Sequence, residues 1–249
     1  MARILEVCVD SLASARAAIA GGADRLELCS ALIAGGLTPY TELLVQIRQE
    51  SDIPVRCLMR PRAGDFLYTQ EEILMMAAQI RALAQAGADG FVIGCLTPDG
   101  DLDKAAMAPL LDAAADKKLT LHRCIDVSRD PCETYLAAHD LGIDTVLTSG
   151  AASNCQAGLA TIEKLLGLRD AQGGPEVLIG AGVNAKVIAA FLARLPQARA
   201  FHMSGKIELE SKMCFRREGV PMGLPGLDEW HIQQTGTKQI QAARKALDL

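Results

Sequence analysis

The stretch Gly22-Ala23-Asp24-Arg25-Leu26-Glu27-Leu28-Cys29 joins the end of a helix to the start of a strand. Glycine at such a position adopts the left-handed conformation that ends a helix, and the aspartate leads directly into an apolar run. The same pattern recurs at Gly87-Ala88-Asp89 and Gly142-Ile143-Asp144, each time before another apolar run. The repetition predicts a chain built from successive strand and helix units.

Short apolar runs rich in Val, Ile and Leu alternate with longer amphipathic segments along the whole chain. The runs are 3–9, 25–29, 54–59, 90–95, 119–124, 145–148, 177–180 and 199–203. Most are apolar on both faces, as in parallel strands covered by helices. We therefore predict a (β/α)8 TIM barrel in which residues 1–249 form a single domain. A doubly wound sheet is the alternative, but no reversal of strand order is evident.

The helices between these runs have clear beginnings. Thr69-Gln70-Glu71-Glu72 is a capping box, and Pro39 and Pro131 stand near the first turns of two further helices. A long loop is expected at about 206–236, followed by a C-terminal helix at 237–247. Loops of that length usually serve as lids or interfaces.

Composition excludes several classes of protein. With 50% hydrophobic and 22% charged residues, the 249-residue chain is not disordered. It has no apolar run near the ~18 residues of a membrane span, and no basic stripe for nucleic acid. Eight cysteines without a C-x-x-C motif favour reduced thiols in a cytoplasmic protein. No nucleotide fingerprint appears, so no organic cofactor is expected.

Polar residues gather where the predicted strands end, which is where barrel enzymes carry their active sites. Strand alternation places Glu6 and Cys8 on one face of the first strand, and Glu27 and Cys29 on one face of the second. These four side chains are candidates for a pocket at the mouth of the barrel. Packing inside the barrel is the alternative, because cysteine is common in cores.

The third and fifth strands add cationic groups and a histidine. Arg60, Arg62 and Asp65 follow the third strand, and two arginines flanking a proline suit a carboxylate or phosphate. Alternatively, the arginines neutralise acidic groups in the mouth. His122, Arg123 and Asp126 end the fifth strand, and a histidine near a carboxylate suggests acid/base chemistry.

The last three strand ends resemble an anion cradle. Glycines after strand seven let a backbone approach a phosphate closely. The candidate anion-binding residues here are Ser149, Gly180, Gly182, His202 and Ser204.

Taken in order, these strings resemble the CutC family of copper homeostasis proteins. The resemblance is carried by Leu5-Glu6-Val7-Cys8, Gly22 to Cys29, Gly35-Gly36-Leu37-Thr38-Pro39, Arg60 to Phe66, His122-Arg123 with Asp126, Val146 to Gly150, Gly180-Ala181-Gly182, Phe201-His202, and Met213 with Phe215-Arg216. It covers nearly the whole chain. It implies a cytoplasmic barrel protein that forms a homodimer or higher homo-oligomer.

The resemblance also implies copper binding. The positions that match the family's cysteine-bearing motifs are Cys8 and Cys29, which points to Cu(I) at the barrel mouth. Cu(I) is a soft ion that prefers thiolates and often takes only two or three ligands. Met203 or His202 would add a third ligand.

A second hypothesis stays open, because the mouth holds more ionisable groups than a thiol site needs. It is an enzyme that acts on a small anionic, phosphorylated metabolite. His122 would be the acid or base, with Glu6, Glu27 or Asp126 as its partner. The reaction class stays open, and a scaffold role has no supporting residue.

Overall fold

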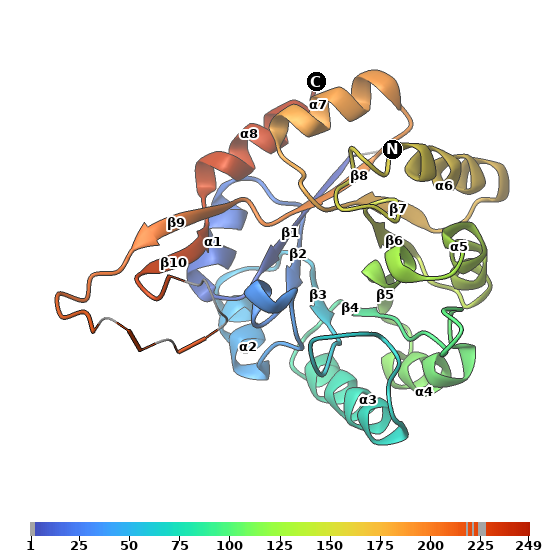
Figure 1. Ribbon diagram of the computed structural model, residues 1–249, viewed down its shortest axis with the longest axis horizontal. Helices are drawn as coiled ribbons and strands as arrows, with labels where there is room; N and C mark the ends of the chain where they lie inside the picture. Colours follow the sequence, from blue (N-terminus) through green and yellow to red (C-terminus); the bar gives the residue numbers. More distant parts are fainter. Residues whose placement is uncertain (1–2, 218, 221, 224–227) are drawn as a thin grey trace.

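The computed structural model describes residues 3–217, 219–220, 222–223 and 228–249. Its strands β1 to β8 are parallel, follow one another in chain order and close into a barrel, with helices outside (Figure 1). The predicted (β/α)8 barrel is confirmed. None of the described helices combines the length and the apolar character needed to cross a membrane.

Each predicted run overlaps one strand of the barrel. The strands are β1 (Ile4–Val9), β2 (Arg25–Leu28), β3 (Val55–Leu58), β4 (Gly90–Ile93), β5 (Lys118–Leu121), β6 (Thr145–Thr148), β7 (Glu176–Ile179) and β8 (Ala200–Met203). The helices are α1 (Leu12–Ala20), α2 (Thr41–Glu50), α3 (Gln70–Gln85), α4 (Lys104–Ala114), α5 (Pro131–Asp140), α6 (Leu159–Gln172), α7 (Ala185–Arg194) and α8 (Thr237–Leu247). Two short 3₁₀ helices, η1 (Leu32–Ala34) and η2 (Arg123–Val127), lie at the strand ends.

The fifth strand is shorter than its apolar run predicts. It ends at Leu121, and η2 begins at Arg123. The ring Nδ1 of His122 accepts a hydrogen bond from the backbone N–H of Cys124 at 3.2 Å. This bond turns the chain out of the barrel, so the polar residues after His122 lie across the mouth rather than along a strand.

The glycine–aspartate turns do more than end helices. Gly22, Gly87 and Gly142 all have positive φ, which a side chain would oppose. The carboxylate of Asp24 accepts the backbone N–H of Leu5, near the start of the preceding strand, at 2.7 Å. Asp89 and Asp144 do the same for β3 and β5. Each aspartate therefore ties the starts of two neighbouring strands together.

The barrel interior holds charged as well as apolar side chains. The main apolar core lies between the strands and the helices, whereas Glu6, Arg25 and Arg56 are buried among the inward-facing side chains. Arg56 donates to the hydroxyl groups of Thr120 and Thr145 at 2.6 and 3.0 Å. Buried charges need such hydrogen-bond partners. Most of these charged side chains lie at the floor of the barrel.

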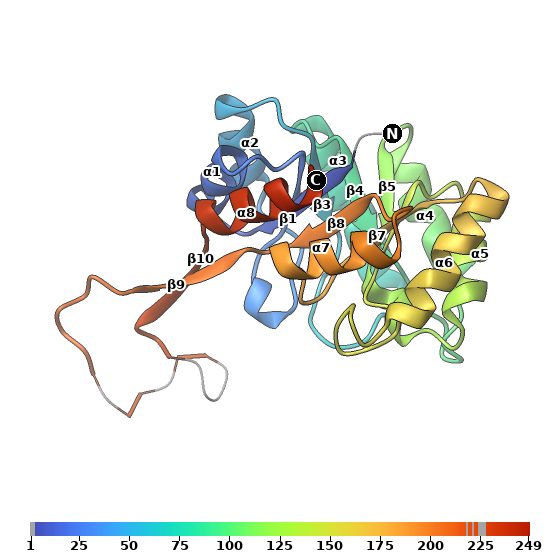
Figure 2. The ribbon, with the colours of Figure 1, turned by 90° about the horizontal axis from the view of Figure 1, so that it is seen from above.

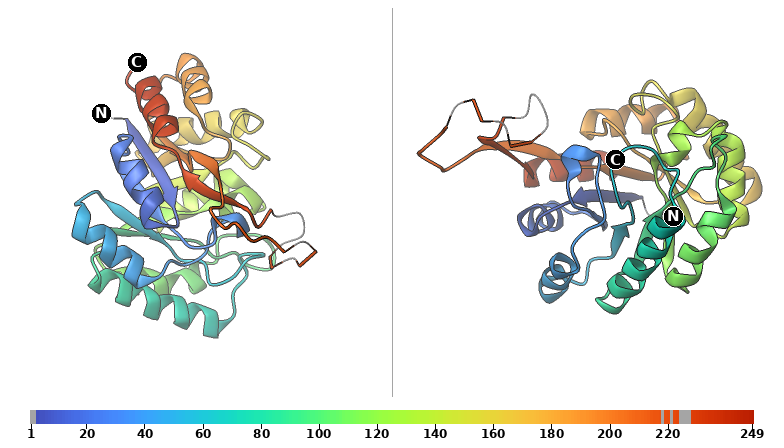
Figure 3. Two further views of the ribbon diagram at one scale, coloured as in Figure 1. Left: turned by 90° about the vertical axis from the view of Figure 1, so that its left-hand side faces the viewer. Right: turned by 60° about the horizontal axis from the view of Figure 1, so that its bottom comes forward.

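The segment predicted as one long loop contains two strands. β9 (Lys206–Glu210) and β10 (His231–Thr235) pair antiparallel and form an arm that projects from the barrel (Figures 2 and 3). Their side chains are mostly exposed, so no buried face produced an apolar pattern in the sequence. Positions 218, 221 and 224–227 of this segment lie outside the described residues. Helix α8 follows the arm, as predicted.

Candidate functional site

A cavity of about 1020 Å³ opens at the carboxyl ends of the strands. The predicted site residues that line it are Cys8, Glu27, Arg60, His122, Arg123, Asp126, Gly182, His202 and Ser204. The base of the arm, including Lys206 and His231, forms another part of the wall. The strand ends therefore do meet around one space, as a barrel requires.

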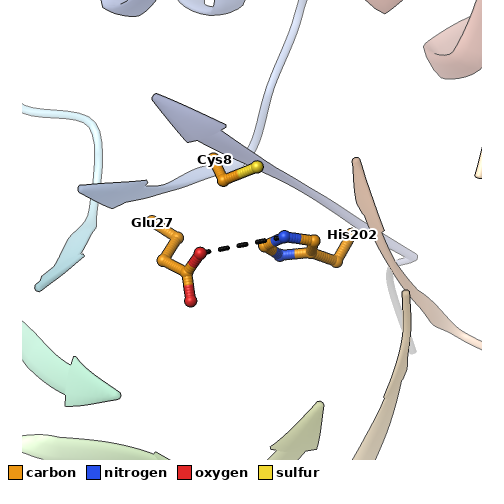
Figure 4. A group of neighbouring side chains, drawn as sticks. All are labelled: Cys8, Glu27 and His202. Atoms are coloured by element: carbon orange, nitrogen blue, oxygen red, sulfur yellow. Dashed lines mark ion pairs between the residues drawn. The ribbon is translucent and has the colours of Figure 1, made fainter. Parts of the chain in front are cut away.

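Cys8, Glu27 and His202 come together on one side of this cavity (Figure 4). They belong to β1, β2 and β8, which are neighbours where the barrel closes. One ligand atom from each lies within 4.8 Å of the others, and His202 Nε2 is 3.8 Å from a Glu27 carboxylate oxygen. One thiol, one imidazole and one carboxylate therefore face a common point.

Glu6 lies below this group and does not line the cavity. It is completely buried, accepts a hydrogen bond from Arg25 Nε at 2.5 Å and contacts His202 Nδ1 at 2.8 Å. Burial opposes its ionisation, but Arg25 and His202 outweigh burial and lower the pKa of Glu6 to about 2. An anionic Glu6 holds the Nδ1–H of His202 and leaves Nε2 turned to Cys8 and Glu27.

The neighbouring groups respond to burial in different ways. Desolvation raises the pKa of Glu27, although His202 opposes the rise. Burial disfavours protonation of His202, but Cys8, Glu27 and Glu6 together raise its pKa well above 6.5. The imidazole is thus the charge that balances an otherwise acidic group of side chains.

Cys29 is set back from the cavity. It is fully buried, and its thiol donates to the Glu27 carboxylate at 3.4 Å. Burial, with Glu27 beside it, raises the pKa of Cys29 well above 9.0. Cys8 and Cys29 pack in one small cluster with Leu58 and Val92. Of the two cysteines predicted as metal ligands, only Cys8 reaches the cavity wall.

His122 and Arg60 lie on the other side of the mouth. His122 is buried beside Phe66, whose ring centroid is 4.7 Å from that of the imidazole. Desolvation, with help from Arg60, lowers the pKa of His122 to about 3. Arg60 donates to the carbonyl oxygens of Ala34, Gly36 and Gly64, so its described hydrogen bonds are all to neutral groups.

Asp126 is an organising residue of the mouth rather than a free base. Its carboxylate accepts from the hydroxyl of Thr148 at 2.5 Å, from the backbone N–H of Ser149 at 2.9 Å and from Arg123 Nε at 2.7 Å. The backbone N–H of Ala151 is a further donor. So many donors occupy the carboxylate of Asp126 and fix the loop after β6.

Besides Glu6 and Cys29, four predicted residues do not line the cavity. Arg62 pairs with Asp65 and with Glu72 of α3, and it holds its own loop to that helix. Ser149 is buried by its bonds to Asp126, and Gly180 lies below the mouth against Leu147. Asp65 is exposed.

Sequence reasoning missed several contributors to the site. Arg25 shares a strand face with Glu27 and Cys29, so the same alternation would have found it. Phe66 belongs to the stretch Arg60 to Phe66, which entered the prediction only through the family resemblance. The residues at the base of the arm follow no apolar or polar pattern in the sequence. Ala181, with φ +68, stands beside Gly182 in the cavity wall.

Comparison with known proteins shows which family the chain resembles. The sequence model of the CutC family matches residues 3–207. A CutC family protein of Vibrio atlanticus is 39% identical, covering 98% of each chain. The human copper homeostasis protein cutC homolog is 41% identical over 96% of this chain and 86% of its own.

Solved structures agree with the sequence relatives. The copper homeostasis protein CutC of Streptococcus agalactiae superposes with a TM-score of 0.76 at 25% identity, covering 81% of this chain and 98% of that one. A phosphoribosylanthranilate isomerase of Thermotoga maritima, 13% identical with a TM-score of 0.53 over 100% of this chain and 99% of that one, shares the fold alone.

Proposed function

Because the chain belongs to the CutC family, we propose that it is a cytoplasmic copper homeostasis protein that takes up Cu(I) as its cargo at Cys8 and His202. The observation that carries this proposal is the group formed by Cys8, Glu27 and His202, whose ligand atoms lie within 4.8 Å of one another. A thiolate and a neutral imidazole are ligands that copper accepts, so Cu(I) would replace the proton on His202 Nε2, which is released to solvent.

The surroundings of His202 support the same assignment. A metal-bound histidine usually donates the N–H of its second ring nitrogen to a carboxylate. This hydrogen bond fixes the orientation of the ring and makes the histidine a stronger ligand. Glu6 stands in that position at 2.8 Å from Nδ1. The carboxylate of Glu27 is a harder ligand that suits Cu(I) less well, so we assign it to balancing charge. Cys29 would join only after giving up its bond to Glu27.

Competition with a Cu(I) chelator tests the assignment. All variants carry Cys214→Ser, which removes the exposed thiol. We expect Cys8→Ser and His202→Gln to weaken Cu(I) binding at least tenfold, and Cys29→Ser to weaken it less. Cys132→Ser, on the outer helix α5, is the matched control. Unchanged affinity in the Cys8→Ser variant would overturn the proposal.

The size of the cavity favours a second candidate function. About 1020 Å³ is at the upper end of small-molecule pockets and far more than one ion needs. We therefore keep the hypothesis of an enzyme acting on a small anionic, phosphorylated metabolite, with Arg60 and Arg123 facing the ligand. His202, oriented by Glu6, is then a better acid/base candidate than His122, whose pKa is too low.

A thermal screen with phosphorylated metabolites tests the second candidate. A true ligand should raise the melting temperature of the wild-type protein and should do so less for Arg60→Ala. If no metabolite stabilises the wild type more than that variant, the enzyme hypothesis fails at its first step.

We also propose that the arm joins copies of this chain into a homodimer or higher homo-oligomer. Large apolar side chains on it are exposed, among them Met213, Phe215 and Ile232. An exposed apolar surface on a projecting hairpin is typical of a contact between chains. Light scattering should show a smaller particle for Phe215→Glu than for the wild type, and an unchanged mass would refute the role of the arm.

A further inference from the structure

Three buried polar atoms without hydrogen-bond partners gather beneath the loop that follows β3. They are Arg60 Nε, Tyr68 Oη and His122 Nε2. A buried polar group without a partner is costly, and native proteins rarely leave several in one place without a reason. The group lies on the β3 and β5 side of the mouth, away from Cys8 and His202.

The protonation of His122 defines what this place can bind. Because Nδ1 accepts the backbone N–H of Cys124, the neutral ring carries its proton on Nε2. The ring packs against Gly94 so closely that a Cβ at that position would lie only 2.6 Å from its Cε1 atom, and the bond from Cys124 holds its Nδ1. His122 Nε2 is therefore a fixed, buried donor rather than an acceptor.

Arg60 presents a second donor of the same kind. Its terminal nitrogens bond to backbone carbonyls, and its Nε–H is buried without a partner. No carboxylate of the described residues forms a salt bridge with it, unlike Arg62 two positions later. A cation and a neutral N–H donor side by side lack only an acceptor, and an oxyanion is the acceptor that would also balance the charge.

Phe66 controls access to these donors. Its ring lies 4.7 Å from the imidazole of His122 and 5.3 Å from the guanidinium carbon of Arg60, and it lines the cavity. The backbone carbonyl of Phe66 accepts the N–H of Leu96 at 2.9 Å, so the backbone of the loop is anchored at this point. The side chain thus covers both donors from the cavity side.

We propose that a small organic anion binds on this side of the cavity, with its carboxylate or phosphate oxygens accepting hydrogen bonds from Arg60 Nε and His122 Nε2 after the Phe66 ring turns aside. The site names a ligand class and contacts for the second candidate function. It does not rest on copper, because none of its residues belongs to the group around Cys8. It can exist as a binding site even if no reaction follows.

Binding of two simple probes tests the proposal on the full chain. Succinate and inorganic phosphate are titrated separately at constant ionic strength, with chloride as the reference anion, and the histidine Nε2–H resonances are followed by NMR. We expect saturable binding of one probe with a shift of the His122 signal, and which probe binds tells carboxylate from phosphate. Loss of one charged hydrogen bond should weaken binding roughly ten- to hundredfold in Arg60→Gln.

Two variants guard against a trivial result. Arg62→Gln is the matched control, because this arginine lies in the same loop but does not line the cavity. The affinity of this variant for the anion should equal that of the wild type. Phe66→Leu should bind several-fold more tightly, since it removes the cover without touching a donor. The proposal is overturned if neither probe saturates either the wild type or Phe66→Leu, or if Arg62→Gln weakens binding as much as Arg60→Gln.

Discussion

Replacing Glu6 by glutamine should cost about 3 kcal/mol of the free energy of unfolding at pH 7. The pKa of Glu6 falls from 4.5 to about 2 in the folded protein, and each unit corresponds to about 1.4 kcal/mol. Removing one partner of a buried ion pair typically costs about 3–5 kcal/mol, which agrees. The variant leaves the buried Arg25 and the partly buried His202 without the carboxylate of Glu6.

Glu27 provides the matched control from the neighbouring strand. It is also buried, but desolvation raises its pKa, so its ionised form is disfavoured by folding. A neutral amide removes that penalty and can still accept from Cys29. We expect Glu27→Gln to leave the stability at pH 7 unchanged or to increase it.

Urea unfolding followed by circular dichroism measures both variants. The folded pKa of Glu6 is lowered, so its contribution is fully present above pH 4.5 and is lost as the pH falls towards 2. The difference between wild type and Glu6→Gln should therefore shrink over that range. A loss of stability below about 1 kcal/mol at pH 7, or an equal loss in both variants, would refute the reasoning. A surface ion pair contributes up to about 1 kcal/mol, and the buried pair of Glu6 and Arg25 should contribute more.

Three further substitutions and one control have clear expected outcomes. Thr69→Ala removes the capping box of α3 and should cost about 1 kcal/mol in thermal unfolding; no change would mean that the helix start is held by other contacts. Asp126→Asn should cost about 2 kcal/mol because it weakens several buried bonds, whereas the exposed Asp65→Asn should stay within about 0.5 kcal/mol, and equal losses would contradict the assigned role. Gly94→Ala should displace the Cys124 side chain, whose sulfur would lie 2.5 Å from the new methyl, at a cost of about 1–3 kcal/mol; an unshifted His122 NMR signal would argue against this contact.

The barrel was predictable because its physics is local and repeated. Parallel strands covered on both faces are largely apolar, and the turns at Gly22, Gly87 and Gly142 mark where β2, β4 and β6 begin. The inward direction of Glu6 and Cys8 followed from strand alternation alone. The arm escaped prediction because its two strands are exposed and bury no patterned face.

The details of the site depend on contacts that no local pattern records. Arg60 and Arg62 look equivalent in the sequence, yet only Arg60 faces the cavity, because Glu72 of α3 captures the other. His202 was expected to contact an anion or to add a third ligand to copper. Its central position arises because β8 closes the barrel against β1 in a register that pairs it with Glu6. Such a register is a property of the closed ring, not of either strand.

The hydrogen bonds that the aspartates accept at the strand starts also make some contacts between neighbouring strands different from others. Three pairs of strands are joined by a carboxylate bound to a backbone N–H, at Asp24, Asp89 and Asp144. Where the fourth would stand, before β8, the sequence has Gln197-Ala198-Arg199, and Arg199 instead forms a half-exposed ion pair with Glu176 at the start of β7. Salt screens exposed ion pairs but leaves backbone bonds largely intact. At the contact between β7 and β8, the strand that carries His202, the backbone amides should therefore exchange hydrogen faster as the ionic strength rises.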